Sequence, residues 1–336
     1  MPSFKINPQH IMEAVYSYPF PEVRDLLDSR VLPAAFMLNT LPVETANKYL
    51  QNYNFQPVLD IPSLDGEINL DELHLPVIER IRRRLQPLLP GIADFSWQYP
   101  IAGSSQAIYT LMAEWKASGE MTSLAVLKGE YEGYAAYATS LKIPVTTYAR
   151  LPHDAPKPGE IWFVSNPSAL DGNFIATDTW RNFVRAGHQI VYDAAYIGLV
   201  TQGSVDVSAP NIRAVLTSPS KVFGVFRYRN TGICFTRTPI SALYGTKWFK
   251  DIPALLDTLL LYENFAPYEL PQRYRSTQQQ LCEALSKVVK THVKPSDTLL
   301  LGYAQNAPAP EFEKFKRGAS YRFGLTKLFE DYEFSS

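Results

Sequence analysis

The sequence is poor in cysteine and in net charge, and each shortage excludes a class of protein. Its 336 residues include only 2 cysteines, and Cys234 and Cys282 lie in apolar or helical surroundings. Neither a disulfide framework nor a metal-ligand spacing is present, which is typical of a protein from a reducing compartment, and no metal site is expected. The net charge of −1 gives no broad attraction for nucleic acid or for an anionic membrane surface.

Long apolar runs are also missing. The run "ALLDTLLLY" (254–262) is too short to span a bilayer, which needs roughly 18 apolar residues, and it contains Asp257. The first residues, "MPSFKINPQH", show no basic region followed by an apolar run, so no secretory signal is expected. These features predict a cytoplasmic protein that binds neither membrane nor nucleic acid.

The middle of the chain alternates short apolar runs with helical segments. Helical periodicity is seen in 75–89, where an apolar stripe lies opposite an arginine run (80–84) that we interpret as a solvated face. Because buried strands that alternate with helices form parallel sheets, the fold class is α/β with a mostly parallel sheet. The predicted strands are 123–128, 144–149, 161–165, 189–194, 213–218 and 232–236.

Composition divides the chain into three parts. Residues 1–75, rich in proline and aromatic residues, are predicted to form an ordered arm with short helices that belongs to a smaller domain. Residues 76–240 form the large α/β domain. Residues 241–336 begin with two helical stretches and end with strand-like 297–303 and 319–329, which predicts a smaller α+β domain.

Ligands of open α/β sheets bind beyond the carboxyl ends of the strands, so the residues that follow each strand are the candidates for a site. Gly103-Ser104-Ser105 opens a helix, where free N–H groups and hydroxyls can bind an anion. Asn166 follows one strand and either begins a turn or donates to a ligand. Asp193 ends an apolar strand, where a carboxylate needs a partner, and Tyr196 comes three residues later.

One lysine completes this set. Lys221 lies in "TSPSKVFGVFRYRN" (217–230), directly after a predicted strand, and arginines 227 and 229 follow it. An isolated lysine is usually solvated. An anion site, an amide, a carboxylate, a phenol and a lysine at successive strand ends instead suit a charged heteroaromatic aldehyde.

These residues resemble fold-type I pyridoxal-phosphate enzymes of the class I/II aminotransferase family. The resemblance covers about 100 to 236 and a further match near 322. Asn166 and Asp193 are separated by 27 residues, and Asp193 and Lys221 by 28, as the family requires. The segments that carry it are "GSS" (103–105), "EYEGY" (130–134), "SNP" (165–167), "DAAY" (193–196), "SPSKVFGVFRYR" (218–229) and "YRFGLT" (321–326).

The resemblance implies a seven-stranded-type sheet between helices, with pyridoxal 5'-phosphate as the cofactor. Lys221 would bind the cofactor as a Schiff base and then move the α-proton, which requires a lowered pKa. Asp193 would pair with the pyridine nitrogen. Asn166 and Tyr196 would bind the phenolic oxygen of the ring, and Tyr131 would stack on its face.

The resemblance also implies a phosphate site and a substrate site. Arg322 would bind the substrate α-carboxylate bidentately. The implied partners are an amino acid and a 2-oxo acid, together with a second copy of the chain in a homodimer. The cofactor-binding set, apart from the residues already given roles, comprises Gly103, Ser104, Ser105, Ser218, Ser220 and Arg229.

Two positions depart from the family pattern. Arg227 occupies a position that is usually glycine, and Glu130 stands where a proline often precedes the stacking aromatic residue. The chain is also short for the family, which predicts a trimmed small domain or arm.

The sequence is compatible with several functions. The first is an aminotransferase that acts through Lys221. The second is a lyase, decarboxylase or cyclase that uses the same site, because substrate orientation selects the bond that breaks. A ligand sensor is a third reading, although no basic helix-turn-helix segment precedes residue 100. A serine–lysine hydrolase built on Ser218 or Ser220 would leave Asp193 and Asn166 without a role.

Overall fold

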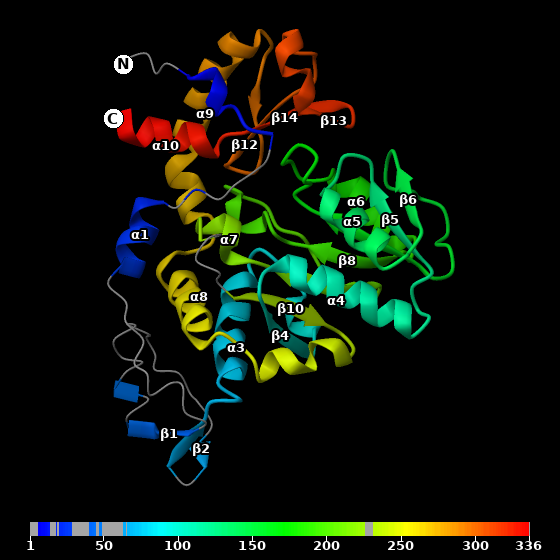
Figure 1. Cartoon of the computed structure of the whole chain (residues 1–336), viewed down its shortest axis with the longest axis vertical. Coiled ribbons are helices and arrows are strands. Elements are labelled where there is room, and N and C mark those ends of the chain that lie inside the picture. The colour runs from blue at the N-terminus through cyan, green and yellow to red at the C-terminus, as the bar shows by residue number, and fades with distance from the viewer. Residues whose placement is uncertain are drawn as a thin grey trace.

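The computed structural model centres on one seven-stranded sheet (Figure 1). It describes residues 6–13, 18, 20–28, 40–44, 47–48, 63–64, 66–225 and 231–335. The strand order is β4-β10-β9-β8-β7-β5-β6. The strands are β4 (Trp97–Ile101), β5 (Ser123–Leu127), β6 (Val145–Tyr148), β7 (Glu160–Ser165), β8 (Gln189–Asp193), β9 (Ile212–Thr217) and β10 (Gly232–Thr236).

The sheet is mostly parallel. Strands β6, β5, β7, β8 and β9 pair in parallel, whereas β10 runs antiparallel to both β9 and β4. All six strands predicted from the sequence are present, with ends that move by one residue at most. The predicted fold class is therefore confirmed.

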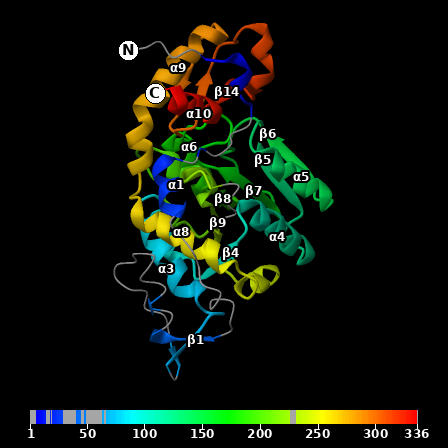
Figure 2. The same ribbon diagram turned by 60° about the vertical axis from the view of Figure 1, so that its left-hand side comes forward.

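Helices cover both faces of this sheet (Figures 1 and 2). One face packs Leu111, Trp115 and Tyr134 against the strands, and these come from α4 and α5. The other face packs Ile78, Trp180 and further residues from α3, α6 and the C-terminal helices. The elements are α3 (His74–Leu85), η3 (Ile92–Asp94), α4 (Ser104–Ala117), α5 (Glu132–Ser140), α6 (Thr177–Arg185), η4 (Ile197–Leu199), α7 (Pro219–Val222), η6 (Ser241–Lys247) and α8 (Ile252–Asn264).

A second sheet of order β11-β12-β14-β13 is formed near the C-terminus. Residues 319–329 were expected to be strand-like throughout, but the strand ends at Gly324 and a helix begins at Thr326. In this helix Leu328 and Phe329 are buried, and Lys327 forms ion pairs with Glu330 and Asp331, three and four residues later. Residues three and four apart are neighbours on a helix and not on a strand. The elements are α9 (Glu269–Val289), β11 (Lys294–Pro295), β12 (Leu301–Ala304), η7 (Pro310–Phe315), β13 (Lys316–Arg317), β14 (Ser320–Gly324) and α10 (Thr326–Ser335).

The described part of the N-terminal arm contains short elements, as the sequence predicts. Met12 pairs with Gly324 of β14, so this segment lies beside the C-terminal sheet. The division of the chain into three parts stays a prediction. The elements are η1 (Pro8–His10), α1 (Pro21–Asp28), β1 (Thr40–Pro42), β2 (Ser63–Leu64) and β3 (Glu67–Asn69).

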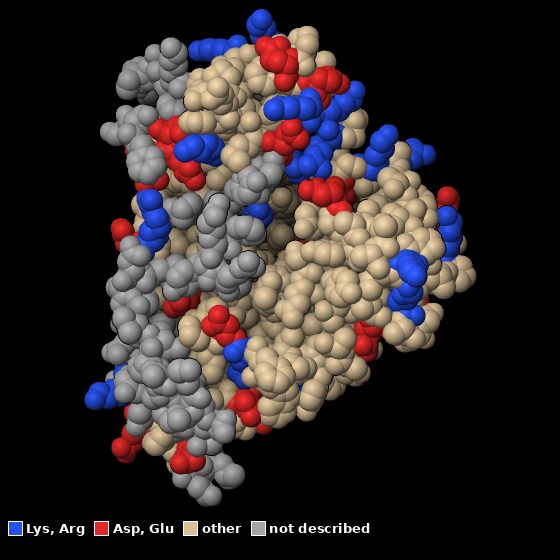
Figure 3. All heavy atoms as spheres, in the orientation of Figure 1, with Lys and Arg blue, Asp and Glu red and all other residues tan. Residues whose placement is uncertain are grey.

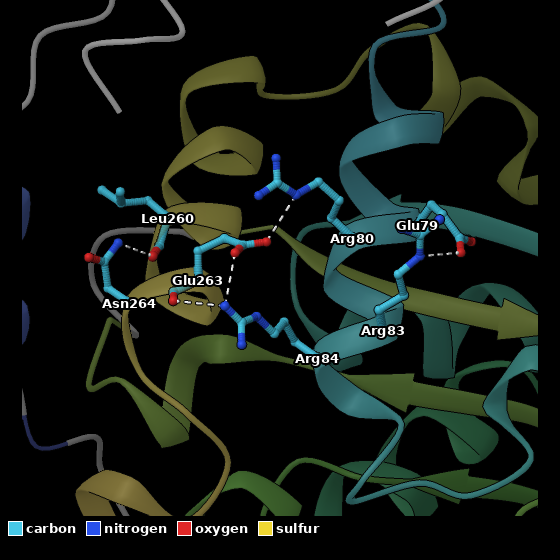
Figure 4. Close-up of polar contacts among 7 residues, drawn as sticks. All are labelled: Glu79, Arg80, Arg83, Arg84, Leu260, Glu263 and Asn264. Carbon is cyan, nitrogen blue, oxygen red and sulfur yellow. Dashed lines mark hydrogen bonds and ion pairs between the residues drawn. The ribbon is translucent and has the colours of Figure 1, made fainter. Parts of the chain in front are cut away.

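The arginine run on α3 is not simply solvated (Figure 4). Arg80 and Arg84 each lie 3.0 Å from the carboxylate of Glu263 on α8, and Arg80 and Glu263 are largely buried. Arg83 pairs within its own helix, with Glu79. The interpretation as a solvated face is wrong for two of the arginines because α8 packs against that side of α3. Among the helices of the described residues, none combines the length and apolar composition that crossing a bilayer requires.

Candidate active site

The candidate residues meet at one edge of the seven-stranded sheet. Ser165 of β7 is paired with Asp193 of β8, which is paired with Leu216 of β9. Because these strands are parallel neighbours, the residues that follow them converge at their carboxyl ends. The face drawn in Figure 3 is hollowed near its centre, below the C-terminal sheet, and charged side chains border the hollow.

Strand β4 brings the turn at Gly103 to the same edge. Ile101 is paired with Gly232, the first residue of β10. A Cβ atom added to Gly232 would lie 3.4 Å from the Cα of Gly103, so the two segments are in close approach. Gly103 itself has φ 79°, a left-handed value that favours glycine before α4 begins.

Asp193 is the buried carboxylate of the site, with 5% of its surface exposed. The Tyr134 hydroxyl donates to its Oδ2 at 2.8 Å, and the Ala195 amide donates to its Oδ1 at 3.1 Å. Burial raises the pKa of Asp193 to about 6, while both hydrogen bonds oppose the rise. The carboxylate is thus largely ionised at neutral pH and can pair with a cation.

Tyr134 is a residue of the site that was not predicted from the sequence. Tyr134 is fully buried, its hydroxyl supports Asp193, and burial raises its pKa well above the usual value. The available signal was its place one helical turn after Tyr131 in "EYEGY". That spacing puts both rings on one side of the first turn of α5, and they meet edge to face with centroids 5.3 Å apart.

Lys221 lies on the short helix α7, which begins directly after β9. Ser218 caps this helix: its Oγ accepts from the Ser220 amide at 3.3 Å, and the two hydroxyls are 2.9 Å apart. Burial, and secondarily the charge of Arg322, lower the pKa of Lys221 to about 8. The lowered pKa expected for a reactive amine is therefore present.

Tyr131 lies at the start of α5, half-buried, and its side chain is hydrogen-bonded to that of Ser105. Gly133 is required beside it, because an added Cβ would lie 2.3 Å from Cε1 of Tyr131. Ser104 begins α4, and its buried hydroxyl has no hydrogen-bond partner among the described residues. A helix N-terminus with an unpaired hydroxyl is a suitable place for an anion.

Asn166 is buried and held within its own turn. Its Oδ1 accepts from the Ile175 amide at 3.0 Å, and its backbone carbonyl accepts from the Tyr192 hydroxyl. Since the side-chain oxygen is used in this way, the amide nitrogen is the group that can donate to a ligand. Asn166 also borders a cavity of about 430 Å³ between α6 and residues 203–209, but Asp193, Lys221 and Arg322 do not line that cavity.

Arg322 and Tyr196 complete the group. Arg322 lies on β14 inside the C-terminal sheet and is buried, with its Nη1 donating to the Ala169 carbonyl and its Nη2 to that of Glu13 at 3.0 Å. Its Nε is buried without a partner among the described residues. Tyr196 is buried; burial raises its pKa to about 12, and Arg322 and Asp193 both act on it.

The structure therefore places most of the predicted residues at the same edge of the sheet. Two further residues singled out in the sequence cannot be placed. Arg229, predicted to bind phosphate, and Arg227, the departure from the family pattern, are both outside the described residues. Within the described part of the chain, no cluster of three or more His, Cys, Asp or Glu side chains is placed to hold a metal ion.

Comparison with known proteins agrees with this arrangement at the level of the fold. No family model matches the sequence, and no curated protein matches it. An aminotransferase from Staphylococcus aureus superposes with a TM-score of 0.61 at 12% identity, over 97% of this chain and 93% of that one. The chain has the fold of the aminotransferases.

Two further structures extend this similarity. A Thermus thermophilus aspartate aminotransferase mutant gives a TM-score of 0.59 at 15% identity, over 79% of this chain and 85% of that one. An L-threonine-O-3-phosphate decarboxylase from Porphyromonas gingivalis gives 0.53 at 14% identity, over 79% and 94%. Since enzymes that catalyse different reactions share this fold, the fold does not choose the reaction.

Proposed function

We propose that this protein is a pyridoxal-phosphate-dependent aminotransferase that moves an amino group between an amino acid and a 2-oxo acid. The observation that carries the proposal is that a buried carboxylate (Asp193) and a buried amine with a lowered pKa (Lys221) lie at the carboxyl ends of two neighbouring parallel strands, and that a buried guanidinium (Arg322) acts electrostatically on the amine. These groups come from β8, α7 and β14.

The donor set fits pyridoxal phosphate. The buried hydroxyl of Ser104, which has no partner among the described residues, and the N-terminal end of α4 suit its phosphate. Gly103, Ser105, Ser218 and Ser220 are proposed as further contacts, together with Arg229, which lies outside the described residues. Asp193 suits its pyridinium nitrogen, and Tyr131 lies beside Ser105, where it can stack on the ring. When bound, the cofactor supplies a carbonyl carbon that accepts an amine and a ring that delocalises negative charge.

The lysine performs the proton transfer in this proposal. At a pKa of about 8, a useful fraction of the Lys221 amine is neutral near neutral pH, so this residue would hold the cofactor and could take a proton from the substrate Cα. Asp193 is ionised at the same pH because its pKa is about 6. Asn166 and Tyr196 act as hydrogen-bond donors to the cofactor oxygen and keep the ring in place.

Arg322 orients the substrate. Its guanidinium now binds two backbone carbonyls, and its Nε is free of partners among the described residues. A substrate carboxylate can accept from Nε and one Nη in the bidentate geometry that arginine favours. Because Arg322 also acts electrostatically on Lys221, the carboxylate is held next to the amine that moves the proton.

The test is to add pyridoxal phosphate to the purified protein and follow the absorbance with a panel of amino acids. We expect a yellow protein whose colour is lost with one donor and restored by a 2-oxo acid. Borohydride reduction should fix the cofactor on Lys221, as read by mass spectrometry, and Lys221→Ala should abolish both results. A wild-type protein that takes up no cofactor would overturn the proposal.

Decarboxylation is the second candidate, because a threonine-phosphate decarboxylase shares the fold. The same panel distinguishes the two reactions: a decarboxylase releases CO2 from the amino acid and leaves the cofactor yellow. The expectations of a homodimer and of a cytoplasmic location stay predictions, and light scattering tests the first.

A further inference from the structure

Glu130 is a buried carboxylate that the proposed chemistry does not use. It directly precedes Tyr131 in the loop between β5 and α5 and is 5% exposed. The Ser165 hydroxyl donates to its Oε2 at 2.5 Å, and the Ser168 hydroxyl donates to its Oε1. A carboxylate that is almost completely buried requires hydrogen-bond partners, and the two serines provide them here.

The neighbouring amides leave both serine hydroxyl protons available for Glu130. The Ala169 amide donates to Ser165 Oγ at 2.7 Å, and the Leu170 amide donates to Ser168 Oγ at 3.1 Å. Since each serine oxygen already accepts one hydrogen bond, each hydroxyl can give its own proton to Glu130. In its ionised form the carboxylate accepts from both serines. Burial raises the pKa of Glu130, and the hydrogen bonds from Ser165 and Ser168 oppose this rise because they stabilise the ionised form.

The two serines lie in the turn that connects the cofactor side of the site with the substrate side. Asn166, the proposed donor to the cofactor oxygen, follows Ser165 directly. The carbonyl of Ala169, in the same turn, accepts from Nη1 of Arg322. Glu130 is therefore hydrogen-bonded directly to the turn that contains Asn166 and contacts Arg322, and it is adjacent in sequence to Tyr131.

We propose that Glu130 is a positioning residue that fixes the 165–170 turn and thereby aligns Asn166 with the cofactor and Arg322 with the substrate carboxylate. The inference rests on the proposed function. It gives the departure from the family pattern at residue 130 a structural role. A proline at this position would make the loop rigid. In this chain the Glu130 carboxylate holds the loop in place through its hydrogen bonds to the facing turn.

Glu130→Gln tests this role with little change in shape. A glutamine accepts from one serine, but its amide nitrogen must donate to the other, whose hydroxyl proton then loses its acceptor. One of the two bonds to the turn is thus lost. Glu160→Gln is the matched control, because Glu160 is equally buried, accepts from Tyr148 through both oxygens, and lies at the opposite end of β7.

Two measurements report the alignment without knowledge of the natural substrate. The first is the dissociation constant of pyridoxal phosphate for the cofactor-free protein, by fluorescence titration. The second is the rate at which the bound cofactor reacts with aminooxyacetate, which has a carboxylate, divided by the rate with methoxyamine, which has none. This ratio depends on Arg322 and is insensitive to a uniform loss of folded protein.

We expect Glu130→Gln to weaken cofactor binding about tenfold, the order of one lost charge-assisted hydrogen bond, and to lower the ratio about fivefold. Glu160→Gln should change neither value by more than about twofold. If Glu130→Gln does not fold, Ser168→Ala removes one donor and should raise the dissociation constant and lower the ratio, as expected for Glu130→Gln. Unchanged values in a folded variant would overturn this inference alone, whereas a wild-type protein that binds no cofactor would overturn the proposed function with it.

Discussion

Single ionisable residues give the site its dependence on pH. Asp193 is buried with two hydrogen-bond donors, and its pKa is about 6 in the folded protein against 3.8 for an ordinary aspartate. A raised pKa means that the folded state holds the proton to a higher pH than the unfolded chain. The stability that this group contributes is therefore present below about pH 4 and is lost as the pH rises through about 6.

Asp193→Asn should remove this pH dependence. Between pH 4 and pH 7 we expect the cofactor-free wild-type protein to lose about 2 to 3 kcal/mol of unfolding free energy relative to the variant. Urea unfolding of both proteins at several pH values measures the difference between their unfolding free energies. The titration of all other groups cancels in this difference because both proteins share those groups. A difference that is constant with pH, or that grows in favour of the wild type, would contradict the prediction.

At the scale of elements, the first turn of α5 sets the position of the Tyr131 ring, which we propose to stack on the cofactor. Tyr131 precedes the helix, and Gly133 leaves the space that its ring occupies. The contact involves the far end of a side chain and no backbone, so a larger residue at 133 would displace the ring and leave the helix intact.

Gly133→Ala should therefore separate stability from binding. Because alanine favours a helix over glycine by about 1 kcal/mol, we expect the free energy of unfolding to be unchanged or slightly higher. Cofactor affinity should fall several-fold, as it should in Tyr131→Ala, and the double variant should be no worse than Tyr131→Ala alone. Fluorescence titration and urea unfolding give the two quantities. Full cofactor affinity in Gly133→Ala would show that the ring does not contact the cofactor.

The contact between α3 and α8 depends on one carboxylate, Glu263, which is bound by Arg80 and Arg84 (Figure 4). Glu263→Gln removes the carboxylate charge that pairs with two arginines, one of them largely buried. We expect a loss of about 2 kcal/mol of unfolding free energy. Glu79→Gln, which breaks more exposed pairs on the same helix, should cost under about 1 kcal/mol. Equal losses in urea unfolding would show that burial does not matter here.

At the scale of the whole molecule, the candidate site lies between two sheets. Asp193 ends β8 of the seven-stranded sheet and Lys221 lies on α7, which follows β9 of that sheet, whereas Arg322 belongs to the C-terminal sheet. Arg322 joins the two, since it donates to Ala169 after β7, and it also binds Glu13 of the N-terminal segment. The proposed substrate recognition and the observed contact between the sheets thus involve the same guanidinium.

Arg322→Met should test this connection. The methionine keeps much of the apolar side chain but leaves two backbone carbonyls without their donor. We expect the free energy of unfolding to fall by roughly 3 kcal/mol and amide hydrogen exchange in residues 163–175 to become faster. Arg317→Met on the neighbouring strand β13, where the side chain pairs with exposed Glu132, is the control and should leave exchange there unchanged. Unchanged exchange in Arg322→Met would contradict the proposed connection.

Much of the fold could be predicted because its signals are local. Buried parallel strands are continuous apolar runs, so all six predicted strands were found, and the residues that follow them converge as the strand-end rule requires. The arginine run on α3 was misjudged because helical periodicity gives the side of a helix and does not show what packs there. The helix that begins at Thr326 was missed because short apolar segments suit both structures.

The sequence by itself determined six of the seven strands of the large sheet, its mostly parallel arrangement and the polar residues placed at the carboxyl ends of these strands, since these depend on residue type and spacing along the chain. Only the tertiary structure decided which side chains meet. Tyr134 reaches Asp193 across 59 residues, Ser165 reaches Glu130 across 35, and Arg322 reaches Ala169 across 153. No local pattern encodes such pairs, because each depends on how separate elements pack, and these contacts set the charge and position of the groups that we propose to act.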